Sequence, residues 1–433
     1  MGHRWATLVE RLRGSLFFVP MVYVLGAVLV SELTVTADRS LFDDRTELPF
    51  RLTTTVEGAR SVLSTVASAT LTFAGIAFSV ALLVFQLASS QYSPRVVHGL
   101  FRDPFNKQVM GVVVGTFTYC LLVLRAVRGS VEAGGDPVIP HVSVGIAVVL
   151  GIATVLAVVA FINHAAHRMD VSEILQGITR GTLRRLPAEA EPSEPEAAPV
   201  TTDGHGFVVR FGANGWIQQV DPEGLLRLVG PGGLVTLHSV PGRYAIAGTP
   251  LCTVWPPPPP AEREEVARRA RAAVDVGDTR TMQQDASYGL RQIVDVALRA
   301  LSPGVNDPTT AQDAIFHAAA VLRELLEAPE VRTVPGEDGR RLLITEASRP
   351  DELVGLAFDE VRLAAADKPA VCIYLLEALS LLVEALRADG RDALCDPLLR
   401  QAAEVVRGAS LASLPEGDVE QVREAYAKRF APE

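Results

Sequence analysis

The chain has 433 residues, of which 48% are hydrophobic and 21% charged, and its formal net charge is −10. An acidic chain is repelled by the phosphates of nucleic acids, so this balance excludes a protein that binds DNA or RNA through its overall charge. The acidic excess lies after residue 165, and we expect every stretch apolar enough to cross a bilayer to lie before it. The composition therefore predicts a membrane domain followed by a large soluble tail.

Four apolar stretches predict transmembrane helices, because a helix needs about 20 apolar residues to cross the hydrocarbon core. We expect spans at about residues 14–34, 61–92, 107–127 and 141–164, within a transmembrane domain of residues 1–165. The first and third stretches are short, so three spans with one interfacial helix is the alternative. The first stretch could also be a cleaved signal sequence, but its long apolar core and the following Glu32 favour an uncleaved anchor.

The orientation is suggested by the flanking charges and by the tail. The basic residues beside the spans favour a cytoplasmic N-terminus only weakly. The tail cysteines, Cys252, Cys372 and Cys395, have neither the spacing of a zinc site nor that of a disulfide framework, which suits a reducing compartment. Because an even number of spans returns the chain to the same side, we expect both termini in the cytoplasm.

The second span carries small and hydroxyl residues along one helical face, at steps of three and four. They are Ser61, Thr65, Ser68, Thr72, Gly75, Ser79, Gln86 and Ser90, and Leu82 is the apolar member of the row. Small residues let transmembrane helices approach closely, so one interpretation is packing within a subunit. The other is a face that lines a water-filled path when copies assemble. No Asp, Glu, Lys or His lies mid-membrane, which argues against a proton relay or a coupled transporter.

His164, His167 and Asp170 lie three residues apart where the fourth span ends. Imidazole and carboxylate groups bind divalent metals, so these residues are a weak candidate for a metal site. Polar residues at the interfacial end of a span are the simpler explanation, and His98 would be needed to complete a site. We expect neither a resident metal nor another cofactor.

The tail changes character along the chain. A helical extension is expected over residues 166–186, and residues 187–200 alternate Glu, Pro and Ala as in an extended linker. Short alternating runs between glycine turns predict a small β-domain, barrel- or sandwich-like, over residues 201–256. Residues 257–433 are predicted to form a helical cytoplasmic domain with a polar, hairpin-like interruption from Val331 to Arg349.

Five consecutive prolines, Pro256 to Pro260, must be extended. A run of this kind predicts a stiff spacer between the β-domain and the helical domain. A docking site for a proline-binding partner is the alternative, although the flanking basic residue that such sites often use is absent.

The densest polar motif of the tail lies between residues 280 and 311. Pro303-Gly304 must end one helix and Asp307-Pro308 starts the next, so much of the motif is explained as a helix-loop-helix corner. A polar corner beside a helix N-terminus could also hold an anion or a partner's backbone. The candidate ligand or partner residues are Arg280, Gln284, Asp285, Arg291, Asp295, Ser302, Asn306, Asp307 and Thr309.

Three stretches of the chain resemble a known family. They are Phe85 to Arg95, then Gln284-Asp285 with Gly289-Leu290-Arg291, and then Ala300 to Pro308. Over nearly its whole length the chain resembles a bacterial family of predicted membrane proteins, domain of unknown function 2254. The resemblance implies several spans followed by a soluble portion, and it implies no reaction, ligand or catalytic residue. We expect the protein in a bacterial inner (plasma) membrane.

The fold expected is thus an α-helical membrane domain of four spans, a small β-domain and an α-helical C-terminal domain. The first functional hypothesis is a homo-oligomeric, channel-like assembly for a small ion, lined by the second span and regulated by the tail. The alternative is a membrane-anchored sensor or scaffold that binds a ligand or protein through the corner at residues 302–310. No catalytic constellation is visible, so an enzyme is not expected.

Overall fold

The computed structural model describes residues 17–41, 55–91, 104–129, 139–167, 170–186, 205–328, 333–345 and 349–430. The chain divides into two compact units, Met1–Asp170 and Val171–Glu433, called here the membrane unit and the tail. The membrane unit contains the long helices α2 (Phe18–Leu41), α3 (Val56–Gln91), α5 (Pro104–Ala126) and α7 (His141–His167). All four are long and apolar enough to cross a membrane, as expected before residue 165.

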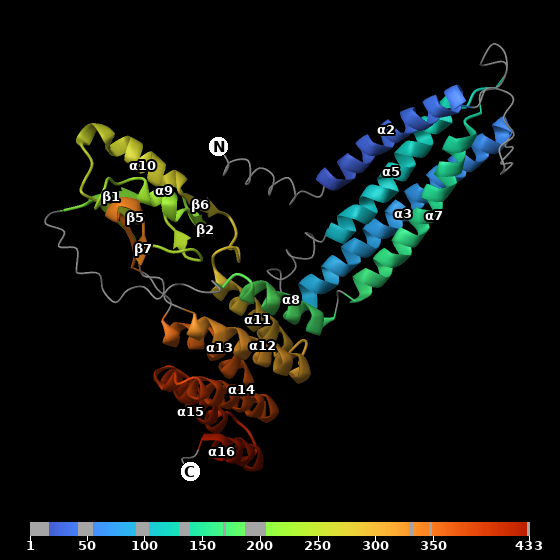
Figure 1. Ribbon diagram of the computed structural model, residues 1–433. Coiled ribbons are helices and arrows are strands. Elements are labelled where there is room, and N and C mark those ends of the chain that lie inside the picture. The colour runs from blue at the N-terminus through green and yellow to red at the C-terminus, as the bar shows by residue number, and fades with distance from the viewer. Residues whose placement is uncertain are drawn as a thin grey trace. The chain divides into compact units, whose positions relative to one another are not determined.

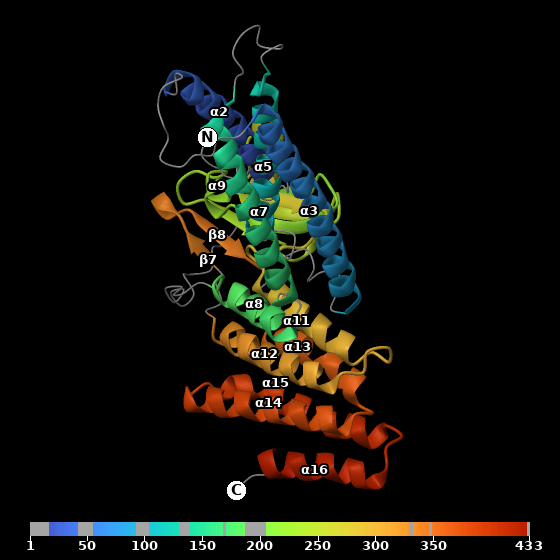
Figure 2. The same cartoon turned by 90° about the vertical axis from the view of Figure 1, so that its right-hand side faces the viewer.

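The four described helices of the membrane unit lie side by side (Figures 1 and 2). Helix α5 packs against α2, α3 and α7, and α7 also packs against α3. Glycines permit close approaches between these helices: Gly111 and Gly115 of α5 lie against Tyr23 of α2, and Gly151 of α7 lies against Val66 of α3. The internal packing of this unit therefore follows the small-residue rule for membrane helices.

Helix α3 is longer than a simple membrane span. Its 36 residues correspond to about 54 Å at about 1.5 Å per residue. The hydrocarbon core of a bilayer is only about 30 Å thick. The helix therefore continues beyond the hydrocarbon.

A fifth helix, α14 (Pro369–Ala388) in the tail, also has the length and hydropathy of a membrane span. The expectation that no such stretch follows residue 165 was therefore wrong. Leu375, Leu379 and Leu386 of α14 are fully buried, and the helix packs against α12, α13, α15 and α16. A helix enclosed by neighbours is apolar on most sides, which explains its membrane-like composition.

The strands in the described part of the tail form two small sheets. The strands are β1 (Phe207–Arg210), β2 (Gly215–Val220), β3 (Leu234–Leu237), β4 (Tyr244–Ala245), β5 (Pro250–Trp255), β6 (Val274–Gly277), β7 (Thr333–Pro335) and β8 (Arg341–Ile344). One sheet has the order β1-β5-β3-β8-β7 and the other β4-β2-β6. The pairs are antiparallel apart from β3 and β8, which are parallel with Val235 opposite Leu342. The predicted hairpin between residues 331 and 349 is confirmed, and it extends a sheet that begins more than 100 residues earlier.

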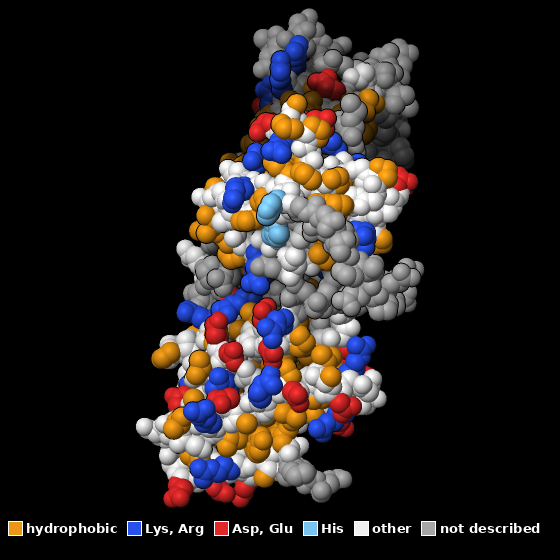
Figure 3. All heavy atoms as spheres, turned by 90° about the vertical axis from the view of Figure 1, so that its left-hand side faces the viewer, with side chains coloured by type: hydrophobic (Ala, Val, Ile, Leu, Met, Phe, Trp, Pro, Cys, Tyr) orange, Lys and Arg blue, Asp and Glu red, His pale blue; other side chains and the backbone are white. Residues whose placement is uncertain are grey.

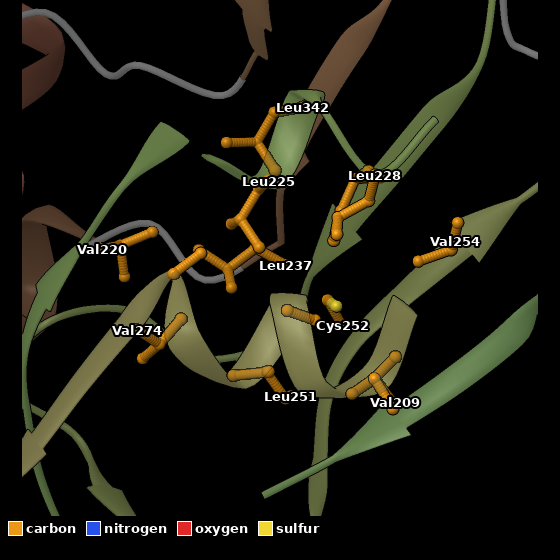
Figure 4. Packing of buried hydrophobic residues seen from close by; sticks show 14 of the residues in the cluster. Val209, Val220, Leu225, Leu228, Leu237, Leu251, Cys252, Val254, Val274 and Leu342 are labelled. Carbon is orange, nitrogen blue, oxygen red and sulfur yellow. The ribbon is translucent and has the colours of Figure 1, made fainter. Parts of the chain in front are cut away.

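One hydrophobic cluster lies between these strands and two helices, α9 (Pro222–Leu226) and α10 (Arg263–Ala272) (Figure 4). Leu237 and Cys252 from the first sheet share it with Leu225 of α9 and Leu342 of β8. Val266 and Ala270 bring α10 into the same cluster. The β core therefore extends past residue 256, where the sequence placed the end of the β-domain.

The proline run joins two elements of this one core, β5 and α10. Its predicted role as a spacer between two domains was therefore wrong. The reason is that α10 has buried alanines and a valine on one face. These side chains pack in the cluster that contains the sheets rather than against the helices that follow.

The remaining helices of the tail form stacked layers (Figure 2). They are α8 (Val171–Leu183), α11 (Ala286–Ala300), α12 (Pro308–Glu327), α13 (Pro350–Ala365), α14, α15 (Cys395–Leu411) and α16 (Glu416–Phe430), with short 3₁₀ turns at Pro260–Glu262, Glu337–Gly339 and Asp392–Leu394. Helix α8 packs on α11 and α12. The expected extension of the fourth span is thus a separate helix, since α7 ends at His167 and α8 starts at Val171. The linker predicted at 187–200 lies outside the described residues.

Candidate functional site

The polar row of the second span, called here the α3 stripe, faces away from the other helices of its unit. Its described side chains are exposed, namely those of Ser61, Thr65, Ser68, Thr72, Ser79 and Gln86, and Gly75 is exposed with them. The side chain of Ser90 lies outside the described residues. On the opposite face of α3, Leu63, Ala67 and Ala77 are buried against neighbouring helices. The packing within one subunit thus uses the face of α3 opposite to the stripe.

Two hydroxyl groups of the α3 stripe, those of Thr72 and Ser79, are hydrogen-bonded to their own helix. Thr72 Oγ1 donates to the carbonyl oxygen of Ser68 at 3.0 Å, and Ser79 Oγ donates to that of Gly75 at 2.9 Å. A donor that is bonded in this way does not require water or a second helix. At Thr72 and Ser79 the stripe can therefore lie against lipid, water or a second helix without leaving an unpaired donor.

Large apolar side chains flank the α3 stripe. At about 100° per residue, Leu71 and Phe78 lie on one side of the row and Ile76 and Leu83 on the other. Leu71 and Phe78 are 61% and 60% exposed. The surface is thus a narrow polar seam between two apolar ridges.

The polar motif of the tail separates into three groups along α11 and α12. In the first group, Arg280 pairs with the buried carboxylate of Asp285, with Nε 2.5 Å from Oδ2. Asp285 is also the N-cap of α11 and accepts from the backbone N–H of Tyr288 and from Ser287 Oγ. The Arg280 guanidinium lies over the rings of Trp216 and Tyr288 at 5.8 and 5.2 Å from their centroids.

The same group joins the sheets to the helices. The Gln284 amide accepts from the backbone N–H of Val220 at 2.9 Å and donates to its carbonyl oxygen at 3.1 Å. Gly242 has φ +89°, and a Cβ there would lie 2.3 Å from Asp285 Oδ2. Arg280, Gln284 and Asp285 are therefore engaged in an internal joint between β2 and α11.

The second group lies in the middle of α11. Arg291 pairs with Asp295 on its own helix at 2.8 Å and with Glu360 on α13 at 2.5 Å. Because both partners belong to this chain, the group fastens α11 to α13. About 15 residues of α11 separate the first group from the third, which is about 22 Å of helix. The nine candidate residues therefore do not form one site.

The third group is the loop between α11 and α12. Asn306 takes a left-handed conformation with φ 47°, and Asp307 caps α12 by accepting from the backbone N–H groups of Thr309 and Thr310. Hydrogen bonds from Thr310 and Thr309 hold the pKa of Asp307 below its ordinary value. Ser302 accepts from the backbone of Asn306 at 2.9 Å. The predicted helix-loop-helix corner, with Asp307 as N-cap and Pro308 at the first helical position, is confirmed.

No cluster of three or more metal-ligating side chains occurs within the part of the chain that the structure describes. The His164 ring lies against Phe105 with centroids 4.6 Å apart. The side chain of His167 and all of His98 lie outside the described residues, so the weak metal candidate at His164, His167 and Asp170 stays a prediction.

The cysteines are buried thiols. Burial raises the pKa of Cys252 to about 12 and that of Cys372 to about 11. Both thiols therefore stay protonated at neutral pH and are poor nucleophiles.

A pocket of about 410 Å³ lies between α13 and α15. Its polar lining is bonded internally, since Arg362 donates to Gln401 at 3.2 Å and Gln401 donates to Asp359. On the face shown in Figure 3, basic and acidic side chains are interspersed over the helices of the tail. Neither feature has the single sign of charge that recognition of a charged polymer requires.

A polar cluster inside the membrane unit has no local signal in the sequence. Asp38, at 8% exposure, accepts from the backbone N–H groups of Val142 and Ser143 at 3.0 Å each, and so caps the N-terminus of α7. The Tyr119 hydroxyl donates to the carbonyl oxygen of Ser143 and bonds Thr34. The partners of Asp38 are more than 100 residues away in the chain, so no local motif could reveal them. The carboxylate lies at the positive end of a helix dipole, which stabilises both.

The bundle of membrane-length helices and the folded tail define a polytopic membrane protein with a mixed sheet and helix tail. Residues 13–380 match the family described as "Predicted membrane protein (DUF2254)". The chain belongs to this family, and the resemblance drawn from its motifs is confirmed.

Similar proteins come from mycobacteria. An uncharacterized protein of Mycobacterium bovis and uncharacterized proteins of two strains of Mycobacterium tuberculosis are each 30% identical to this chain over 331 residues. The match covers 74% of this chain and 62% of each relative, so the chain spans less than two thirds of their length. No solved structure matches the chain significantly.

Proposed function

We propose that this protein forms a homo-oligomeric, channel-like assembly in which the α3 stripes of several copies face a common axis. The observation that carries the proposal is the outward direction of the stripe, because its small and hydroxyl residues are exposed while the opposite face of α3 packs inside the subunit. Membrane helices place small residues where another helix approaches. A second copy of α3 is the partner helix that this surface fits.

The glycines support this assignment. Gly111, Gly115 and Gly151 each lie against a side chain of a neighbouring helix in the same subunit. A Cβ at Gly75 in the α3 stripe would meet no described atom within 4 Å. The close contacts within the subunit therefore use other glycines, and the space beside Gly75 is open to a partner.

The chemistry of the seam suits a small ion. Hydroxyl oxygens and the Gln86 amide can replace part of a hydration shell, as polar groups do in other pores. The flanking ridges, with Leu71 and Phe78 on one side, provide apolar contact between neighbouring copies. Regulation by the tail belongs to the same proposal, together with an inner-membrane location and cytoplasmic termini.

Cysteine cross-linking tests the assembly. Ser68→Cys and Ser79→Cys should form disulfide-linked dimers between copies in membranes under mild oxidation, because the same face of α3 meets itself near an axis. Leu156→Cys is the matched control, since Leu156 lies on α7 and is 65% exposed. Cross-linking that is no greater at Ser68 and Ser79 than at Leu156 would contradict the proposal.

Ion flux tests the pore. Purified protein in proteoliposomes should conduct a small ion, and Ser68→Leu, Thr72→Leu or Ser79→Leu should reduce the flux by about tenfold or more, because each replaces a polar wall with an apolar barrier. Leu156→Ala, on the outer face of α7, should leave the flux within about twofold. A bilayer that stays sealed with the assembled protein present would count against a channel.

The alternative, a sensor or scaffold that acts through residues 302–310, has less support. The polar groups of Ser302 are hydrogen-bonded within the local turn, and the carboxylate of Asp307 is hydrogen-bonded in the cap of α12. Asn306→Ala should therefore leave any partners recovered with the full chain unchanged, whereas loss of a partner would favour the sensor.

A further inference from the structure

Helix α8 is the first element of the tail after the membrane unit. Only three residues separate the end of α7 at His167 from the start of α8 at Val171. Beyond α8, the chain passes through the Glu, Pro and Ala-rich stretch at 187–200 before it enters the sheets at β1. Along the chain, the short path from α7 to the folded tail therefore leads through α8.

The docking of α8 on the tail is close. Thr182 is fully buried against Gly289 of α11, where a Cβ would lie 1.8 Å from Thr182 Oγ1. Leu175 is also fully buried, and Ile178 is 8% exposed. Since no side chain other than hydrogen fits at Gly289 in this arrangement, α8 and α11 are complementary in shape.

The second partner of α8 is α12. Thr179 Oγ1 and Nδ1 of His317 are 2.8 Å apart, and both side chains lie within the contact between the two helices. The buried residues of α8 are four, Leu175, Ile178, Thr179 and Thr182. A helix of 13 residues is marginal in water without tertiary contacts. The docked state of α8 is thus held by a small surface, half of which is threonine.

We propose that α8 is the coupling element of this protein, and that its docking on α11 and α12 determines the conformation of the end of α7. Release of α8 from the tail frees the last turns of α7, and docking restrains them. The proposal deepens the proposed function, because regulation of a channel by the tail rests on such a connection.

Hydrogen exchange on the full chain in detergent tests the coupling. Leu175→Asp places a carboxylate in the docked face and should raise exchange in residues 171–183 by about tenfold or more. If α8 is the coupling element, exchange in residues 160–167 of α7 should rise as well. Gln176→Asp is the matched control, because the neighbouring Gln176 is exposed on α8 and should leave both segments unchanged.

Two insertions test which part of the chain carries the coupling between α8 and α7. A short Gly-Ser segment after Asp170 should leave α8 docked and abolish the response of α7 to Leu175→Asp. The same segment within 187–200 should leave the response intact. The proposal is overturned if Leu175→Asp releases α8 while α7 exchange is unchanged, if it fails to release α8, or if both insertions act alike.

The flux assay separates this inference from the proposed function. If the protein conducts, Leu175→Asp should alter the flux at least threefold relative to Gln176→Asp. If the wild-type protein does not conduct, the channel proposal fails, and the hydrogen-exchange comparison still decides whether α8 couples the two segments.

Discussion

His317 is a titratable side chain in the contact between α8 and α12. Burial lowers its pKa from the ordinary value of 6.5, and the nearby carboxylate of Asp313 opposes part of that shift. The folded chain therefore binds a proton at His317 less readily than the unfolded chain does. The resulting stabilisation is present above about pH 6.5 and is lost as the pH falls through the lower pKa of the folded state.

We expect acidification below pH 6.5 to weaken the docking of α8, because protonated His317 is disfavoured where it is buried. Exchange in residues 171–183, corrected for the chemical rate, should rise on acidification in the wild type. His317→Gln keeps a polar side chain without a titration in this range, so its exchange should depend less on pH. Equal pH dependence in the two proteins would contradict the assignment to His317.

Residues with the same chemistry serve different purposes according to their partners. Asp285, Asp307 and Asp38 each accept from backbone N–H groups at the start of a helix. The sequence identifies Asp307 as a cap, because its Pro308 neighbour marks a first turn. It does not identify Asp38, whose partners follow more than 100 residues later.

At the scale of the helix, a glycine in contact with a neighbouring helix and a glycine on the exposed α3 stripe predict opposite effects of substitution by leucine. A Cβ at Gly111 would lie 2.5 Å from the Tyr23 ring, whereas one at Gly75 would meet no described atom within 4 Å. Gly111→Leu should therefore force α2 and α5 apart and cost about 1–3 kcal/mol of stability by overpacking. Gly75→Leu should leave the subunit stable and disrupt the assembly.

Denaturation in SDS and oligomer size in detergent separate these outcomes. Gly111→Leu should unfold at lower SDS, as measured by helix content from circular dichroism. Gly75→Leu should unfold like the wild type and run as a smaller species. If Gly75→Leu left the oligomer unchanged, the α3 stripe would not be the contact between copies.

Helix α14 illustrates how an element can have a misleading composition. Its hydropathy satisfies the criterion for a membrane span, yet Leu375 and Leu379 are fully buried inside the tail. Hydropathy measures how apolar a segment is and does not distinguish lipid from protein neighbours. The neighbouring helices α15 and α16, which are amphipathic or polar, show that α14 has a protein environment.

At the scale of the whole molecule, the sheet of the tail depends on a hairpin from a distant part of the chain. Leu342 of β8 is fully buried in the cluster that α9, α10 and the sheets share. We expect Leu342→Ala to cost about 3 kcal/mol, since it removes buried methyl groups and leaves a cavity. The fluorescence of Trp216 and Trp255, which lie in the two sheets, should follow urea unfolding of the tail in the full chain.

Leu343→Ala is the control for this substitution, because Leu343 is the next residue of β8 and is only partly buried. It should cost about 1 kcal/mol or less. Equal losses for the two substitutions would show that β8 does not contribute to the core as the structure has it.

The amino-acid sequence by itself determined the elements whose signals are local. The four membrane helices follow from apolar length, the hairpin at 331–349 from a polar interruption of the helical pattern, and the cap of α12 from Asp307-Pro308. Each signal arises from residues close in the chain, because helix periods, turns and caps depend on neighbours within a few positions. The family also follows from short motifs.

The tertiary structure decided which surfaces meet. The stripe of α3 is visible in the sequence, but its outward direction depends on α5 and α7, which contact the opposite face of the helix. In the same way, α8 packs against Gly289 and His317, which lie more than 100 residues later in the chain. The proline run joins β5 to α10, a helix of the same core. These outcomes depend on shape complementarity between segments distant in sequence, which a periodic pattern does not encode.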